Sequence, residues 1–200
     1  MPYSIFLEEH QYIDFSSGNI QEKATELFSD LNNSIEIAKT AYEYVRDCIP
    51  HSFDIQPNAI TAKASDVLKH RTGICHAKSN LLAALLRAQR IPAGFCFQRI
   101  ILSDIGTLRY CVHCFNALFV ASHWIRVDAS GNTNGKNAQF SLAEPQLAFP
   151  DRNSGGEFFW DGIYAKPHLE TMIMLDRATS IRDILHNIPD HIIEKPDIVL

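Results

Sequence analysis

One stretch of about twenty residues constrains the fold more than any other part of this sequence. The segment Arg71–Asn80 (RTGICHAKSN) contains a glycine turn, and a strongly apolar run, Leu81–Arg87, follows it directly. Apolar residues recur there at helical spacing, so the sequence predicts a buried central helix with Thr72 or Gly73 as its cap. A cysteine, Cys75, stands at the junction between the turn and the helix.

The position of Cys75 matters for its chemistry. A thiol in the first turn of a helix lies near the positive end of the helix dipole and near free backbone N–H groups. Both features favour the thiolate, which is the nucleophilic form of cysteine. A cysteine is also an ordinary small core residue, so this position needs chemical partners before it indicates catalysis.

Two β-rich runs further along the chain supply such partners. The runs 110–120 and 123–131 are separated by two residues, a loop length typical of a β-hairpin. With that loop, His113 and Asp128 lie on one face of the hairpin as diagonal neighbours, about 7–8 Å apart at the backbone. A loop one residue longer or shorter would put them on opposite faces.

Cys75, His113 and Asp128 together match the residue types of a Cys-His-Asp catalytic triad. In such a triad the imidazole accepts the thiol proton, and the carboxylate fixes the imidazole tautomer and stabilises the imidazolium. We therefore expect Cys75 to be the nucleophile, His113 the base and Asp128 the orienting acid. Asn116 lies three residues after His113 and faces the other side of the strand, which argues against a papain-type asparagine role.

The same residues resemble the transglutaminase-like superfamily. The resemblance covers about residues 42–131 and rests on four segments: Gly73–Cys75, Leu85–Gly94, His113 and Trp124–Ser130. It implies a papain-like α+β fold, in which a helix that begins at the cysteine packs on an antiparallel sheet that carries the histidine and the aspartate. The sequence departs from the family where Cys114 and Phe115 follow the histidine, and this leaves the substrate class open.

Other segments fit the same architecture. The sequence pattern predicts helices over 20–28, 34–49, 66–70 and 181–187 and a strand over 95–102. Asn33, Ser65 and Ser180 are the expected helix caps, and the aromatic run Phe158–Trp160 is expected to complete the sheet or line the cleft. We expect one domain over residues 1–200, with its core at about 35–131 and with 132–200 completing it.

Two further histidines lie close to Cys75 in this prediction. In transglutaminase-like proteins a segment similar to 49–55 lies near the active cleft, so the resemblance makes His51 or Ser52 a candidate for binding an oxyanion. The preferred interpretation of that segment is a surface loop. His76 directly follows Cys75, and because adjacent helical residues point about 100° apart, we expect it to face the rim or the solvent.

Composition and charge exclude several functional classes. The net charge of −5 argues against a nucleic-acid partner. No apolar stretch approaches the length of a transmembrane helix, and the N-terminal segment lacks the features of a signal peptide. The five cysteines are odd in number and lack the spacing of a disulfide framework. We therefore expect a cytoplasmic protein that binds neither nucleic acid nor membrane.

A metal or redox site is the main alternative to the triad. Cys111-Val112-His113-Cys114 is formally a Cys-x-x-Cys motif. Within a β-rich run, however, residues three apart point to opposite faces, so both cysteines could reach one zinc ion only across a bulge. No loop has the ligand spacing of a calcium site. We expect neither a metal nor another cofactor.

The sequence thus predicts a thiol enzyme that acts through a thioester acyl-enzyme. Hydrolysis of a peptide, protein or small amide substrate, as in a cysteine protease or amidase, is the preferred interpretation. Attack by a substrate amine in place of water would make the protein a transglutaminase. A non-catalytic protein-interaction module on the same fold is the third hypothesis; such modules typically lack a triad residue, whereas this chain has all three.

Overall fold

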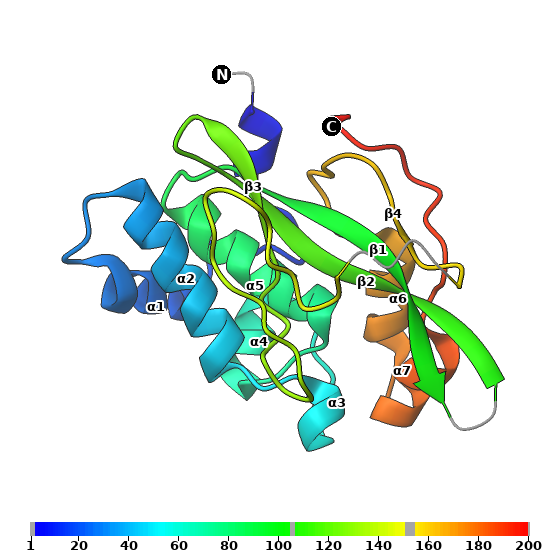
Figure 1. The fold of residues 1–200 in the computed structure, drawn as a ribbon. Helices are drawn as coiled ribbons and strands as arrows, with labels where there is room; N and C mark the ends of the chain where they lie inside the picture. The colour runs from blue at the N-terminus through cyan, green and yellow to red at the C-terminus, as the bar shows by residue number, and fades with distance from the viewer. Residues whose placement is uncertain (1–2, 105–106, 151–154, 200) are drawn as a thin grey trace.

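The structure, a computed structural model, describes residues 3–104, 107–150 and 155–199. After a short 3₁₀ helix, Ser4–Leu7, the elements in chain order are α1 (Gly18–Phe28), α2 (Ser34–Cys48), α3 (Ser52–Ile55), α4 (Ala64–His70), α5 (Cys75–Ala88), β1 (Ala93–Asp104), β2 (Thr107–Val120), β3 (His123–Val127), β4 (Phe158–Phe159), α6 (Leu169–Arg177) and α7 (Ile181–Asn187). Figure 1 shows α1, α2 and α5 toward one end of the sheet and α6 and α7 toward the other.

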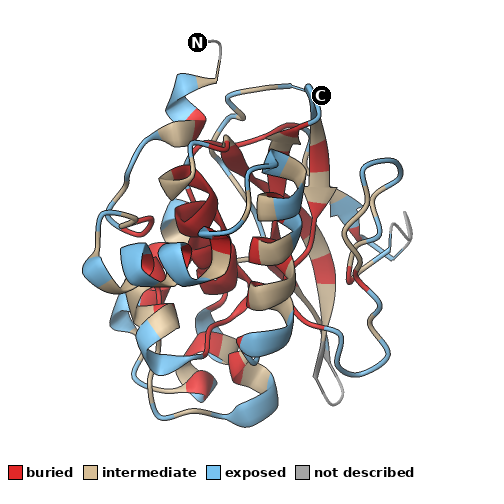
Figure 2. Ribbon diagram, turned by 90° about the vertical axis from the view of Figure 1, so that its left-hand side faces the viewer, coloured by how far each residue is buried: buried red, intermediate tan, exposed pale blue. Residues whose placement is uncertain are grey.

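The helix α5 is the buried centre of the fold. Every residue from Cys75 to Arg87 is buried (Figure 2), and the helix contacts β1, β2, α1, α2 and α4. Its apolar side chains share one core cluster with those of the two long strands and the N-terminal helices. A helix that is covered on all sides can be apolar around its whole circumference, so the predicted central helix is confirmed.

Near the end of α5, Arg87 carries a buried charge. Its guanidinium donates hydrogen bonds to the backbone carbonyls of Glu8, Ala93 and Ala165 at 2.7–3.1 Å. Planar guanidinium groups suit such a role because their five N–H donors point in fixed directions. Arg87 therefore fastens the N-terminal segment and the segment before α6 to the central helix.

The sheet has the strand order β3-β2-β1-β4, and its paired strands are antiparallel. Ala121 and Ser122 form the two-residue loop between β2 and β3, with φ angles of 50° and 66°. Two positive φ angles are what a type I′ hairpin turn requires. Val120 pairs with His123, and the pairing continues to the end of β3. The predicted hairpin and its register are confirmed.

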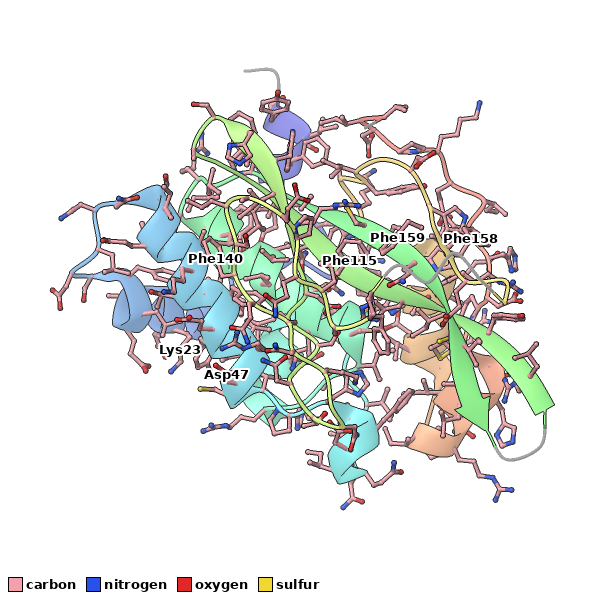
Figure 3. All side chains as sticks on the ribbon, viewed as in Figure 1. Lys23, Asp47, Phe115, Phe140, Phe158 and Phe159 are labelled. Carbon is pink, nitrogen blue, oxygen red and sulfur yellow. The ribbon has the colours of Figure 1, made fainter. Side chains whose placement is uncertain are left out.

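The short strand β4 extends the sheet on the free side of β1. Phe158 pairs with Arg99, and Phe159 pairs with Gln98. Phe159 also packs edge-on against Phe115, with ring centroids 5.9 Å apart, and Figure 3 shows the two side chains on the same side of the sheet. Of the two predicted roles for the aromatic run, completion of the sheet is therefore the one that the structure confirms.

Predicted helix caps have mixed outcomes. Asn33 and Ser180 accept backbone N–H bonds at the starts of α2 and α7, so both are confirmed as caps. Ser65 is not a cap, because Lys63 occupies the N-cap position of α4. The backbone and hydroxyl of Ser65 instead donate to the carboxylate of Asp14.

The sequence pattern does not predict α3 or α6. The segment of α3 has only four helical residues, and its cap is His51, which is an uncommon cap residue. No side-chain cap precedes α6, whose buried residues join a second core cluster with α7. Within the described ranges, none of the helices has both the length and the apolar character that crossing a bilayer would require.

Candidate active site

The start of α5 places the thiol of Cys75 at one end of the buried helix. Cys75 is the first helical residue and is 8% exposed. The predicted cap at Thr72 or Gly73 is wrong: Ile74 holds the N-cap position, and no local side chain bonds to the helix start. The hydroxyl of Thr72 is bonded to another segment. Instead, the N–H of Cys75 faces Nε2 of His51 at 3.1 Å.

His51 contacts a backbone N–H with each of its ring nitrogens. Nε2 faces the N–H of Cys75, and Nδ1 accepts from the N–H of Phe53 at 3.2 Å, which caps α3. A neutral imidazole has one N–H and one lone pair. It follows that only one of these two contacts can be a hydrogen bond accepted by the ring at any time.

His113 and Asp128 lie together, as the hairpin register predicts. Nε2 of His113 is 2.8 Å from Oδ2 of Asp128, and both side chains are buried. His113 comes from β2, and Asp128 follows the last residue of β3. The backbone N–H groups of Ser130 and Ala148 donate to the same carboxylate at 3.0 and 3.1 Å. The carboxylate is therefore held in place from three sides, and it orients the imidazole.

The surroundings of Cys75 favour its thiolate. Burial raises the pKa of the thiol, but the charges of His76 and His113 and hydrogen bonds to His113 and His51 lower the pKa well below its ordinary value. Burial lowers the pKa of His113, but Asp128 and Cys75 raise it to about 10. Burial raises the pKa of Asp128, yet His113 and Ser130 leave it lowered. The group can therefore hold a thiolate, an imidazolium and a carboxylate together.

His76 does not face the rim or the solvent, so that expectation is wrong. The residue is fully buried, and its Nδ1 lies 3.4 Å from the sulfur of Cys75. Its ring stacks on Phe97 at 6.2 Å and lies 6.4 Å from His168, which directly precedes α6. Since the sequence pattern does not predict α6, it could not predict the cover over His76.

The remaining core cysteines differ chemically from Cys75. Cys111 and Cys114 belong to two separate core clusters, as expected for residues three apart on a strand. Burial raises the pKa of Cys111 to about 12 and that of Cys114 well above its ordinary value. Among the described residues, no group of three or more His, Cys, Asp or Glu side chains is arranged to hold a metal ion.

The segment after Asp128 lies across the site. The ring of Phe149 packs on His113 with centroids 4.7 Å apart, and the Lys136 ammonium lies 5.1 Å from the Phe149 ring. Earlier in this segment, the hydroxyl of Thr133 donates to the carboxylate of Asp54 in α3 at 2.8 Å. One continuous segment thus connects the helix next to His51 with the side chain of His113.

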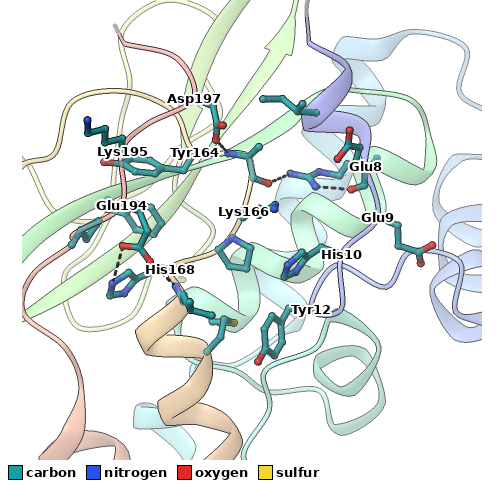
Figure 4. Close-up of a pocket in the computed structure, with 18 residues that line it drawn as sticks. Glu8, Glu9, His10, Tyr12, Tyr164, Lys166, His168, Glu194, Lys195 and Asp197 are labelled. Atoms are coloured by element: carbon teal, nitrogen blue, oxygen red, sulfur yellow. Dashed lines mark hydrogen bonds and ion pairs between the residues drawn. The ribbon is translucent and has the colours of Figure 1, made fainter.

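A cavity of about 560 Å³ lies elsewhere in the molecule. Three stretches of chain, 5–12, 164–172 and 192–197, form most of its wall (Figure 4). Cys75, His113 and Asp128 are not among the described residues that line it. The cavity is therefore separate from the thiol site, although His168 lies both in its wall and beside His76.

Comparisons with known proteins agree with this geometry. The family model of the transglutaminase-like superfamily matches residues 21–129, which include Cys75, His113 and Asp128. No curated protein sequence matches the chain.

Two solved structures are similar to this chain, and the first of them supports the fold described above. A candidate cysteine protease from Cytophaga hutchinsonii has a TM-score of 0.50 and 19% identity, over 64% of this chain and 42% of that chain. A candidate protease from Parabacteroides distasonis has a TM-score of 0.43 and 14% identity, over 75% of this chain and 31% of that chain. This chain thus spans less than half the length of either protein. The match of the family model over more than half of the sequence shows that the chain belongs to the transglutaminase-like superfamily.

Proposed function

We propose that this protein is a thiol hydrolase that cleaves peptide or amide bonds through a thioester on Cys75. The observation that carries the proposal is the lowered pKa of a thiol at a helix start, beside a histidine held by a buried aspartate. A thiolate–imidazolium pair is what nucleophilic cysteine catalysis requires. Membership of the superfamily supports the same reaction class.

The proposed reaction has two halves. In the first, the Cys75 thiolate attacks the carbonyl carbon, the C–N bond breaks, and the His113 imidazolium gives its proton to the leaving amine. In the second, His113 takes a proton from water as the water attacks the thioester, and the C–S bond then breaks to restore the thiolate. Asp128 keeps the imidazole of His113 in one orientation during both halves.

His51 and the backbone of Cys75 are suited to bind the oxyanion. While Nδ1 of His51 caps α3, Nε2 of the neutral ring carries the proton. The N–H of Cys75 lies 3.1 Å from Nε2 and points at it, so no oxygen fits between the two groups as they stand. A negatively charged substrate oxygen would replace this contact and accept from the N–H of Cys75 and, in this tautomer, from Nε2–H, as in an oxyanion hole. The interpretation of His51 as an oxyanion ligand is thus part of this proposal.

The acyl-enzyme itself is the sharpest test. The protein is treated with p-nitrophenyl acetate, and mass spectrometry locates any acetyl group on the five cysteines. We expect rapid acetylation of Cys75, whose thiolate is stabilised by His113 and His76, and little of Cys48, the exposed cysteine at the end of α2. The variant Cys75→Ser should lose the rapid phase, and Cys114→Ser is the matched control that should keep it.

Two results would contradict the proposal. One is the absence of an acetyl group on Cys75, and the other is equal labelling of Cys75 and Cys48; either would favour a non-catalytic module. Adding methylamine to the same assay separates hydrolysis from amine transfer. We expect acetate as the main product, and predominant formation of N-methylacetamide would indicate a transglutaminase instead.

A further inference from the structure

A second buried charge on α5 lies close to the thiol. Lys78 is fully buried and follows Cys75 by three residues, so the two side chains lie on neighbouring parts of one helix face. Its ammonium donates to the backbone carbonyl of Ile49 at 2.6 Å and to that of Ser130 at 3.1 Å. A lysine is rarely buried unless its charge is compensated.

The two carbonyls belong to the segments that flank the site on either side. Ile49 precedes His51 by two residues, and Ser130 follows Asp128 by two residues. The single ammonium of Lys78 therefore joins the segment of His51 and the segment of Asp128 to the helix that begins at Cys75. The sequence analysis gave Lys78 no role, although it is a lysine within a run predicted to be a buried helix.

Charged groups from several elements surround this ammonium. Burial lowers the pKa of Lys78 to about 8, while Asp128, Asp54 and Cys75 oppose that effect and Lys136 adds to it. Asp47, in α2, also lies within its electrostatic reach. A pKa of about 8 leaves most of the Lys78 side chains charged at pH 7.

We propose that Lys78 is a positioning residue of the thiol site, which holds the His51 and Asp128 segments on α5 and balances the negative charge of the triad. The inference rests on the proposed function. A thiolate, an imidazolium and a carboxylate carry one net negative charge, and Lys78 brings that buried group of four to neutrality. An unbalanced charge in a buried site is costly, so removal of the Lys78 ammonium should make the thiolate of Cys75 less stable.

The test measures the alkylation of Cys75 by iodoacetamide against pH, with the modified site located by mass spectrometry. The rate depends on the thiolate, so the midpoint of the profile reports the pKa of Cys75. The uncharged variants are Lys78→Met and Lys78→Gln; glutamine keeps N–H donors for the carbonyls but has no charge. The charge-preserving variant is Lys78→Arg.

Arg87→Met is the matched control. Arg87 is also a buried cation of α5 that bonds to backbone carbonyls, but it lies about 18 Å further along the axis than Cys75 at a rise of about 1.5 Å per residue. Its loss should destabilise the fold without moving the midpoint. Thermal unfolding of every variant gives the structural cost separately from the electrostatic effect.

We expect both uncharged variants to raise the midpoint by about one pH unit, which is about a tenfold loss of thiolate at a fixed lower pH. Lys78→Arg should largely restore the wild-type midpoint. The inference is overturned if a folded uncharged variant keeps the wild-type midpoint, or if Arg87→Met raises the midpoint equally. It is also overturned if no uncharged variant folds, because Lys78 would then be a purely structural residue. An ordinary midpoint in the wild type, unchanged in His113→Ala, would refute the proposed function instead.

Discussion

The first turn of α5 and the middle of β2 each bury a cysteine. Cys75 and Cys114 are both almost inaccessible, and burial raises the pKa of both thiols. At Cys114 nothing reverses that effect, and the thiol stays protonated. At Cys75 the charges of His76 and His113 and the hydrogen bonds to His113 and His51 reverse it, and the pKa falls well below the ordinary value.

The difference shows that burial does not itself activate a thiol. Cys114 packs among apolar side chains, whereas Cys75 has imidazole nitrogens on more than one side. Positive charge and hydrogen bonds stabilise the thiolate most effectively where water is excluded. A reactive cysteine in this fold is therefore defined by the polar groups that share its burial.

The largest expected effect comes from removing the histidine that Asp128 holds. In His113→Ala, Cys75 should lose its protonated partner and become chemically more similar to Cys114. The alkylation midpoint should rise by two pH units or more, which is about a hundredfold loss of thiolate at low pH. The pH profile of iodoacetamide alkylation measures this directly, and an unchanged midpoint would show that the pair with His113 does not form.

Removal of His76 should have a smaller effect. The variant His76→Phe keeps an aromatic ring on Phe97 but removes the nitrogen near the sulfur. Nε2 of His76 has no hydrogen-bond partner within the described residues, whereas Asp128 holds the ring of His113. We expect the midpoint to rise by about one pH unit or less. A rise as large as that of His113→Ala would make His76 the main partner of Cys75.

The His113–Asp128 pair also predicts how stability depends on pH. The pKa of His113 in the folded protein, about 10, lies above its unfolded value of 6.5. Its contribution to the free energy of unfolding is therefore fully present below pH 6.5 and is lost as the pH rises toward 10. Urea unfolding should show a difference in the free energy of unfolding between wild type and Asp128→Asn. This gap should be largest near pH 6 and should shrink as the pH rises.

The control for this measurement is Asp30→Asn, which changes an exposed aspartate. Its stability difference from wild type should stay nearly constant over the same pH range. A gap for Asp128→Asn that is equally constant would mean that the folded protein does not raise the pKa of His113.

The smallest effect is expected at Cys114. The variant Cys114→Ala removes one buried sulfur and should cost about 1 kcal/mol of stability through packing alone. The alkylation midpoint of Cys75 should not move, and in wild type Cys114 should react only after unfolding. Alkylation of Cys114 in the folded protein would remove the contrast between the two thiols.

Local sequence signals predict much of this fold. The two residues Ala121 and Ser122 fix the hairpin register, and that register brings His113 to Asp128 because side-chain direction alternates strictly along a strand. The caps at Asn33 and Ser180 likewise depend on neighbours in sequence. Such features need no knowledge of the tertiary structure.

The features that the sequence pattern does not predict all depend on distant contacts. The N–H of Cys75 meets a ring from a residue 24 positions earlier, so local capping rules at Thr72 and Gly73 fail. His76 is buried because the segment around His168 packs near it. The Lys78 ammonium donates to carbonyls from two other segments. Helical periodicity alone gives no information on any of these partners.

The order of the chain has a consequence for the protein during its synthesis. Cys75 leaves the ribosome before His113 and Asp128, so the growing chain carries it at first without the partners that stabilise its thiolate. A thiol in an unfolded chain has a pKa of about 8.5 and is mostly protonated at neutral pH. Cys75 is therefore mostly a neutral thiol in the nascent polypeptide. Its thiolate is stabilised only after β2 and Asp128 have been made and have folded onto α5.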